Sequence, residues 1–538
     1  MKLTGFLDDA SAQAIDVAWF RNALLPASEY GRRAFEAMQP FGPGQQQAAA
    51  TSARRIADLA TQLDDERIDA LRECLAQTPE ISDSIARISV GRVPLDSDLL
   101  LLLRACDAMS RVDILVAPFC APCGSDATRA LSALIERGRS GRYGFYLDAT
   151  FDDRLREARI AYEAAASAFE LARSRIASGV AQHLGRERIE SDEFIVMRDT
   201  LTNGLPQSVH IIREAPTYFL CELELDEAAI VLLAARDAAL ATVAQEETAV
   251  RDRIGAQIRA YLDGLDAALT RLGEIDLLVA QVRFTRRFGC VAPDFCAEAN
   301  VAFVGGRYLP LHDELRAQGR HYVKIDVDLD TLAVLTGPNM GGKSVCLRTC
   351  ASIAFLAAFG LPVPADSARI GLFTSIAWLG IGAESAHGGL FSAFAGEVLR
   401  LRDLLSTMSE NGLIFIDEFA RTTNPAEGVA LLVAIIASLR RRGCIGFVAT
   451  HLAGIAAAAD TAHFAVRGLR DVPKHAASQD LAAVLSALGD AMDYRISRVA
   501  RADASHADAI ALAGLLGIDA RIINEAYAAF NAAHDEKA

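Results

Sequence analysis

The stretch that decides the fold is residues 332–344, LAVLTGPNMGGKS, in which an apolar strand pattern runs into the start of an apolar helix pattern. Its end matches the motif G-x-x-x-x-G-K-[ST]. Glycines let backbone N–H groups turn inward around phosphate oxygens, and the N-terminus of the following helix adds its positive end. The motif predicts a phosphate-binding loop with its adjoining helical turn, formed by Gly337, Pro338, Asn339, Met340, Gly341, Gly342, Lys343, Ser344 and Val345.

Two acidic residues follow a second apolar strand pattern, LIFI, at Asp417 and Glu418. Paired acids at the end of a strand are usually only solvated, but the phosphate loop upstream favours a functional interpretation. We expect Lys343 to reach the β- and γ-phosphates of ATP, and Ser344 and Asp417 to hold Mg²⁺. Glu418 would orient or deprotonate the attacking water. These residues therefore predict an ATPase that uses ATP and Mg²⁺.

A histidine follows a third apolar strand pattern, GCIGFVA, within the sequence Ala449-Thr450-His451. At the edge of a sheet, His451 can sense the γ-phosphate. Alone it would be interpreted as a core or capping histidine. Together with the other two motifs, a catalytic role is favoured.

Strand and helix patterns alternate after Pro293, and the apolar runs end in Gly, Asp or Thr. Such runs indicate buried strands whose C-terminal ends carry the chemistry. We expect an α/β ATPase domain over 286–490. The strands are expected in VAFVGG, YVKIDVDL, LAVLTG, LIFIDE and GFVATH. From about Asp493 the pattern returns to helix, which predicts a helical segment over 491–538.

The first half of the chain has mainly helical patterns. Residues 1–150 predict a helical core, and residues 151–285 predict long lever helices. No proline occurs from 123 to 205 or from 217 to 292. A helix of about 50 residues would extend about 75 Å. The alternative is a series of shorter helices, broken near Gly255, Gly264 and Gly273.

A short segment between the two helical stretches, residues 187–224, alternates apolar and polar residues as a small strand-rich tip would. It contains eight acidic residues and three arginines, and so has a net charge of −5. This is a poor surface for binding phosphates. The whole chain has a net charge of −15, which lowers the expectation of DNA binding without excluding a local basic stripe.

Composition places the chain among globular proteins, with 52% hydrophobic and 23% charged residues. We expect no membrane span and no signal peptide. The ten cysteines are scattered, which predicts a reducing cytoplasm rather than a disulfide framework. Cys120 and Cys123 have CxxC spacing, but a structural zinc site usually needs a second such pair. The sequence leaves open whether they bind metal or are ordinary thiols.

The motifs TGPNMGGKS, IDEFART and ATH occur in an order and spacing that resembles the MutS ATPases, members of the ABC-type P-loop proteins. The segment 389–397, GLFSAFAGE, lies where that family has its signature. By analogy Ser392 would approach the γ-phosphate bound to the opposite subunit, which implies a homodimer. The segment SHADAIALAGLLGIDARIINEA resembles the family's dimerisation helices. Val345 stands where the family usually has Thr, which should leave Mg²⁺ binding intact.

Departures from the family bear on function. We expect the mismatch-reading domain of the family to be absent, because the chain is short and contains no Phe-x-Glu. Ala420 and Thr422 replace usual glycines, which should stiffen the subunit-crossing loop. The sequence NPAEG at 424–428 is closer to the branch without mismatch recognition.

The resemblance implies a dimeric ATP-driven switch whose lever helices act on DNA, in mismatch repair or another DNA transaction. The alternative is a protein client. Short MutS-like ATPases of this layout resemble the ATPase of systems that reactivate cobalamin-dependent aminomutases, such as lysine aminomutase. A third possibility, ATP as a regulatory ligand with negligible turnover, fits poorly with the complete set of Lys343, Ser344, Asp417, Glu418 and His451.

Overall fold

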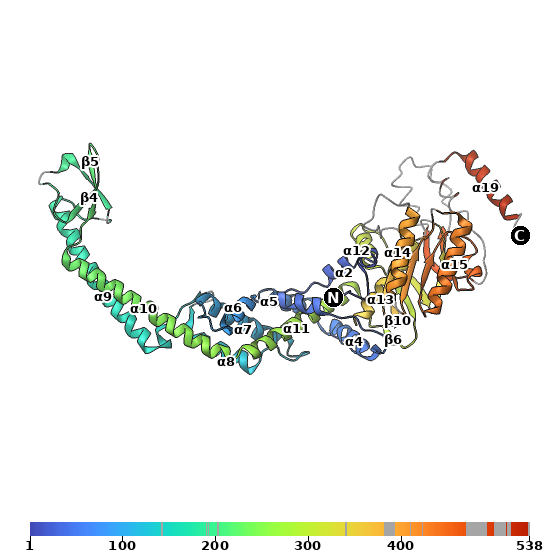
Figure 1. Cartoon of the computed structure of the whole chain (residues 1–538), viewed down its shortest axis with the longest axis horizontal. Helices are drawn as coiled ribbons and strands as arrows, with labels where there is room; N and C mark the ends of the chain where they lie inside the picture. Colours follow the sequence, from blue (N-terminus) through green and yellow to red (C-terminus); the bar gives the residue numbers. More distant parts are fainter. Residues whose placement is uncertain are drawn as a thin grey trace. The chain divides into compact units, whose positions relative to one another are not determined.

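The structure is a computed structural model that describes all residues except 141–143, 190, 192, 202–203, 339–341, 381–392, 409, 422, 470–491, 500–509, 511–512, 514–517 and 536–538. The chain folds into two compact units. The first unit consists of Met1–Ala76 and Leu272–Ala538, and the second of Gln77–Arg271. Figure 1 shows the elements of each unit. The domain boundaries at 150, 285 and 490 stay predictions.

A six-stranded sheet forms the centre of the first unit. Its order is β11-β12-β13-β9-β14-β15, and neighbouring strands are parallel except for β14 and β15. The strands are β9 (Leu332–Thr336), β11 (Ile376–Gly380), β12 (Leu413–Asp417), β13 (Ile445–Ala449), β14 (His463–Leu469) and β15 (Met492–Arg498). Pairing places Asp417 opposite Ala449, and Ala449 opposite Leu335. The C-terminal ends of three strands therefore meet at one edge.

Helices cover this sheet because its strands are apolar on both faces. Residues of α14, α15 and α16 pack with Leu332, Ile414, Ile416 and Val448 in one buried cluster. Alternation along β12 turns Phe415 to the other face, and α13 contacts β12 and β13. The helices on the sheet are α13 (Lys343–Ala358), α14 (Ala393–Thr407), α15 (Pro425–Arg441) and α16 (Ile455–Ala458); α19 (Ala520–Asp535) is the C-terminal helix.

A second sheet of the first unit has the order β6-β10-β7-β8. Its strands are β6 (Asp294–Cys296), β7 (Val301–Gly306), β8 (Ile325–Leu329) and β10 (Ser367–Gly371). The remaining helices of this unit are α1 (Asp9–Ala14), α2 (Val17–Ala23), α3 (Glu29–Ala37), α4 (Gln46–Gln62), α5 (Asp65–Ala76), α12 (Leu309–Ala317) and the C-terminal part of α11 (Leu262–Phe288). Asp276 of α11 is 1% exposed and accepts hydrogen bonds from Ala27 N (3.0 Å), Ser28 N (2.6 Å) and Ser28 Oγ (2.6 Å). This carboxylate ties α11 to the start of α3.

The second unit is mostly helical and ends in a small sheet. Its helices and strands are α6 (Ser82–Ser89), α7 (Asp96–Val116), α8 (Asp126–Ile135), η1 (Glu136–Gly138), β1 (Arg139–Ser140), β2 (Gly144–Phe145), η2 (Ala149–Phe151), α9 (Asp153–His183), β3 (Glu193–Met197), η3 (Arg198–Thr200), β4 (Val209–Glu214), β5 (Tyr218–Leu223), α10 (Glu227–Arg259) and the start of α11. Helices α9 and α10 pack along their length (Figure 1). Their half-buried pair Arg159–Glu247 joins them at 2.9 Å. The strands form an antiparallel sheet in the order β3-β5-β4, as the predicted tip requires.

The long helices agree with the sequence in one case and differ in the other. Residues 153–183 form one uninterrupted helix, α9. The second proline-free stretch does not form one helix of about 50 residues, because α10 ends at Arg259 and α11 begins at Leu262. The alternative of shorter helices is right that this stretch divides, but wrong in placing the breaks at the glycines. Added Cβ atoms would lie 2.9 Å from Pro94 at Gly255, 2.5 Å from Ala127 at Gly264 and 2.6 Å from the carbonyl of Tyr30 at Gly273. These glycines allow close packing inside helices.

The expected return to helix at Asp493 is also wrong, because residues 492–498 form β15 and pair with β14. Their sequence, MDYRISR, alternates in the two-residue period of a strand. Further along the chain, Ala520–Asp535 forms helix α19. In the part of the chain that the structure describes, no helix is both long enough and apolar enough to cross a bilayer.

Candidate nucleotide site

The loop between β9 and α13 begins and ends with glycines in the left-handed region, Gly337 (φ 147°) and Gly342 (φ 80°). A Cβ on Gly337 would lie 2.9 Å from the Cβ of Val466, and one on Gly342 would lie 2.9 Å from Cδ1 of Tyr494. Both conformation and space therefore favour glycine here. The predicted residues 339–341 lie outside the described part of the chain.

Lys343 is the first residue of α13, and its side chain is 4% exposed. Its ammonium donates hydrogen bonds to the carbonyl oxygens of Gly337 (2.9 Å) and Pro338 (3.1 Å). It lies 3.8 Å from Oε1 of Glu418. Burial lowers the pKa of Lys343, while the carboxylates of Glu418 and Asp417 act to raise it. The structure thus brings the predicted lysine to the predicted acidic pair.

Asp417 ends β12 and is 9% exposed. Burial raises the pKa of its carboxyl, an effect that the Ser344 hydroxyl opposes through a hydrogen bond. Its Oδ1 atom is buried and has no hydrogen-bond partner among the described residues. A buried carboxylate oxygen without a partner, beside a hydroxyl, fits a hard cation such as Mg²⁺, which prefers oxygen ligands. Ser344 and Asp417 therefore suit the metal role predicted for them.

Glu418 follows in the left-handed conformation, with φ 57°. Its N–H donates to the carbonyl of Ala449 at 2.9 Å, which fixes the backbone at the sheet edge. Its carboxylate lies 3.8 Å from the Lys343 ammonium and 3.7 Å from Nη1 of Arg421. A non-glycine residue with positive φ is sparsely populated, and such outliers gather at functional sites. The conformation directs Glu418 toward the loop that holds Lys343.

His451 lies one residue beyond Thr450, whose N–H donates to the carbonyl of Leu335 at 3.1 Å. The Thr450 hydroxyl accepts from Leu452 N at 3.1 Å. His451 itself is exposed and makes no hydrogen bond or ion pair with any described residue. The structure therefore places His451 at the same edge of the sheet as Asp417 and Glu418, but without a contact to either.

The predicted residues divide into three groups. Gly337, Pro338, Lys343, Asp417 and Glu418 are joined by contacts, and Ser344 reaches Asp417. Val345 lies in the first turn of α13, and His451 lies just beyond the C-terminal end of β13. Neither residue contacts Asp417 or Glu418. Ser392, like Asn339, Met340 and Gly341, lies outside the described residues.

Several contacts near the site were not predicted from the sequence. Glu397 of α14 accepts a hydrogen bond from Ala420 N at 2.8 Å, and Arg421 pairs with Glu418. Thr336 at the end of β9 bonds to Nε2 of His463 at 2.8 Å. These partners are distant in sequence or belong to loops, so no period or motif indicates them. Only their place within motif-bearing segments drew attention to 397 and 421.

Comparison with known proteins identifies this region. Residues 333–532 match the family model for MutS domain V. The chain is 34% identical over 181 residues to a protein named endonuclease MutS2 from Streptococcus sanguinis, an alignment that covers 34% of this chain and 22% of that protein. It is 32% identical over 202 residues to the protein of the same name from Clostridium botulinum, covering 37% and 25%.

A third protein of that name, from Pelotomaculum thermopropionicum, is 30% identical over 199 residues, covering 37% of this chain and 25% of that protein. The alignments thus span about a quarter of the length of these curated relatives. The matched region contains β9, the loop, Asp417, Glu418 and His451. Residues 333–532 are therefore similar to domain V of the MutS family, as the sequence motifs predict.

Proposed function

We propose that the chain binds and hydrolyses ATP as a MutS-family switch and that it acts on DNA. The observation that best supports this function is the convergence of Lys343, Asp417 and Glu418 at the end of the β9–α13 loop. The MutS domain V match supports the family's chemistry here. The relatives named MutS2 support the family assignment.

ATP would lie with its phosphates against the loop and the N-terminus of α13, where backbone N–H groups and the helix dipole favour anions. Lys343 would exchange the carbonyls of Gly337 and Pro338 for β- and γ-phosphate oxygens. Those carbonyls hold the ammonium in place at 2.9 and 3.1 Å beforehand. The exchange needs little side-chain movement, because the ammonium is already part of the loop.

Ser344 and Asp417 would hold Mg²⁺, which neutralises phosphate charge when bound. Glu418 would accept the proton of a water whose oxygen attacks the γ-phosphorus, so that the P–O bond to ADP breaks and phosphate leaves. Lys343 and Arg421 lie 3.8 and 3.7 Å from the Glu418 carboxylate and would orient it before the reaction. His451 would contact the γ-phosphate.

A homodimer would complete the site, with Ser392 of one subunit approaching the γ-phosphate bound by the other. ATP binding would join the subunits, and hydrolysis would release them. The long helices α9 and α10 would carry this change to the bound DNA.

The test is DNA binding by the Glu418→Gln protein with Mg·ATP, since this variant should hold the ATP-bound state. Duplex, branched and single-stranded probes should be titrated at several salt concentrations. Tight binding that weakens steeply with salt supports phosphate contacts. No binding at low salt, with ATP still bound, would contradict the DNA assignment and leave the ATPase assignment intact.

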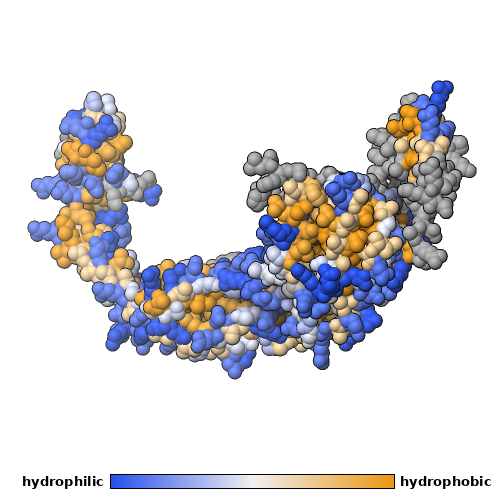
Figure 2. All heavy atoms as spheres, turned by 45° about the vertical axis from the view of Figure 1, so that its right-hand side comes forward, coloured by the Kyte–Doolittle hydropathy of each residue, from blue (hydrophilic) through white to orange (hydrophobic). Residues whose placement is uncertain are grey.

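A protein client is the second candidate, and the tip of the second unit favours it. The segment 187–224 has a net charge of −5. Its strands β3 and β4 expose Ile195 (48%), Met197 (41%), Ile211 (40%) and Ile212 (44%). Figure 2 shows apolar surface at this end of the unit. Acidic and apolar surface suits a protein better than a phosphate backbone.

The client would be a cobalamin-dependent aminomutase, from which ATP turnover would eject damaged cofactor. The discriminating measurement is nucleotide-dependent binding of a purified aminomutase by the Glu418→Gln protein, with and without Ile195→Asp. Binding that the tip substitution abolishes would favour the client. Absence of binding, together with salt-sensitive DNA binding, would exclude it.

A further inference from the structure

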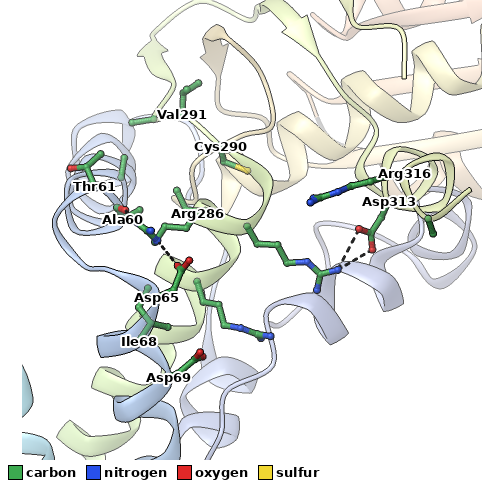
Figure 3. Close-up of a pocket in the computed structure, with 17 residues that line it drawn as sticks. Ala60, Thr61, Asp65, Ile68, Asp69, Arg286, Cys290, Val291, Asp313 and Arg316 are labelled. Atoms are coloured by element: carbon green, nitrogen blue, oxygen red, sulfur yellow. Dashed lines mark hydrogen bonds and ion pairs between the residues drawn. The ribbon is translucent and has the colours of Figure 1, made fainter. Parts of the chain in front are cut away.

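A pocket of about 1320 Å³ lies in the first unit, away from the nucleotide site. Its walls come from α4, α5, the end of α11, residues 289–292 and α12 (Figure 3). Part of the wall is apolar and is formed by small or aliphatic side chains. These are Ala57, Ala60, Ile68, Val291, Ala292 and Ala317. The pocket is therefore large enough for a small molecule and offers it one apolar side.

Arginines line the rest of the pocket, and two of them are neutralised. Arg286 donates to Asp65 at 2.9 Å and to the carbonyl of Ala60 at 2.7 Å. Arg287 pairs with Asp313 at 3.1 Å (Figure 3). Both guanidinium groups are held in place by these bonds. They give the pocket a fixed arrangement of donors rather than a free charge.

Two other arginines of the pocket, Arg283 and Arg316, have no hydrogen bond or ion pair with the residues that the structure describes. Arg72 of α5 adds charge beside Arg283, and its Nη1 atom is buried with no partner in the described chain. Burial lowers the pKa of Arg283, as do the charges of Arg72 and Arg287, while Asp69 opposes this. Arg283 is half-buried, and a half-buried positive charge that is only partly compensated is costly.

The only partly compensated charge of the arginines and the position of the nearby carboxylates indicate which class of ligand the pocket suits. Guanidinium groups bind phosphate through paired hydrogen bonds. The same pocket is also lined by three carboxylates, which would repel an anion, at Asp65, Asp69 and Asp313. A long polyanion would bring further phosphates past these carboxylates, whereas a compact anion would not. Nucleic acid is therefore disfavoured relative to a small phosphorylated molecule.

We propose that this pocket is a second anion site, which binds a small phosphorylated molecule with its phosphates on Arg283 and Arg316 and its carbon part on the apolar wall. The site does not depend on the proposed ATPase function, because it shares no residue with the loop of Gly337–Ser344. Its ligand would join α5, α11 and α12.

Isothermal titration with inorganic tripolyphosphate tests this proposal. The wild type should show two classes of site. The Arg283→Gln/Arg316→Gln protein should lose one class, with affinity about tenfold or more weaker per arginine, because charge-assisted hydrogen bonds are strong. Lys343→Met should lose the other class and keep this one. The matched control is Arg369→Gln, an exposed arginine paired with Glu298 outside the pocket.

Folding of the variant is checked by its melting temperature, which should stay the same or rise because the substitution removes a positive charge that lies near Arg72 and Arg287. If the double variant fails to fold, Arg316→Gln alone supplies the test, since Arg316 is exposed. Unchanged tripolyphosphate binding by the folded variant overturns the proposal. So does binding of a single-stranded oligonucleotide that depends on Arg283 and Arg316 when tripolyphosphate and ADP do not bind there.

Discussion

Replacement of Asp276 by alanine should destabilise the first unit more than any surface change. The carboxylate is 1% exposed and accepts three hydrogen bonds, two of them at 2.6 Å, from Ala27 and Ser28. Removing it leaves two backbone N–H groups and a hydroxyl without this acceptor. Each bond to a charged group contributes about 1.5–3 kcal/mol, and the three are not additive. We expect a loss of about 3–5 kcal/mol in the free energy of unfolding, similar to breaking a buried pair.

Urea denaturation followed by tryptophan fluorescence measures this loss. The chain has two tryptophans, Trp19 and Trp378, and both belong to the first unit, so that the signal reports its unfolding alone. The control is Asp58→Ala, which changes an exposed aspartate of α4 in the same unit. A loss below about 1 kcal/mol for Asp276→Ala, or equal losses for the two variants, would refute the proposed tie between α11 and the start of α3.

Three further substitutions test the site and the helices. Ala420 has φ 62°, so Ala420→Gly should raise the free energy of unfolding by up to about 1 kcal/mol; a decrease in urea midpoint would contradict this strain. A Cβ on Gly273 would lie 2.6 Å from the Tyr30 carbonyl, so Gly273→Ala should lower stability by about 1–3 kcal/mol, whereas Gly396→Ala, with open space, should not. Burial raises the pKa of Asp417 above 3.8, so its contribution to stability is lost as pH rises through the folded-state pKa. Asp417→Asn should therefore melt higher than wild type at pH 7, with a difference that shrinks toward pH 4, and equal melting curves across this range would count against a buried charge.

The site could be predicted from sequence wherever chemistry follows a local pattern. The loop from Gly337 to Ser344, Asp417 and Glu418 stand directly after apolar strands, and parallel strands bring their C-terminal ends to one edge. The contacts of Glu418 with Arg421, and of Ala420 with Glu397, depend on backbone conformation and on a helix elsewhere in the chain. No periodicity encodes such contacts.

The fold was harder to predict where the local helix propensity of a residue and its tertiary contacts favour different structures. Gly255, Gly264 and Gly273 resemble helix breakers, yet tertiary contacts require their small size and keep them helical. The interruption falls at 260–261 instead, where no glycine or proline stands. Strand β15 pairs at the edge of the sheet, and its two-residue period is easily missed beside the helical tail.

ATP hydrolysis by Glu418→Gln tests the central claim most directly. The wild type, Glu418→Gln and the control Glu410→Gln, an exposed residue outside the site, should be compared for Mg·ATP affinity and kcat. We predict nearly unchanged ATP affinity and a kcat at least about 100-fold lower for Glu418→Gln alone, because loss of a general base has this effect. A Glu418→Gln protein that hydrolyses ATP at the wild-type rate would contradict the assignment of this edge of the sheet as the catalytic site.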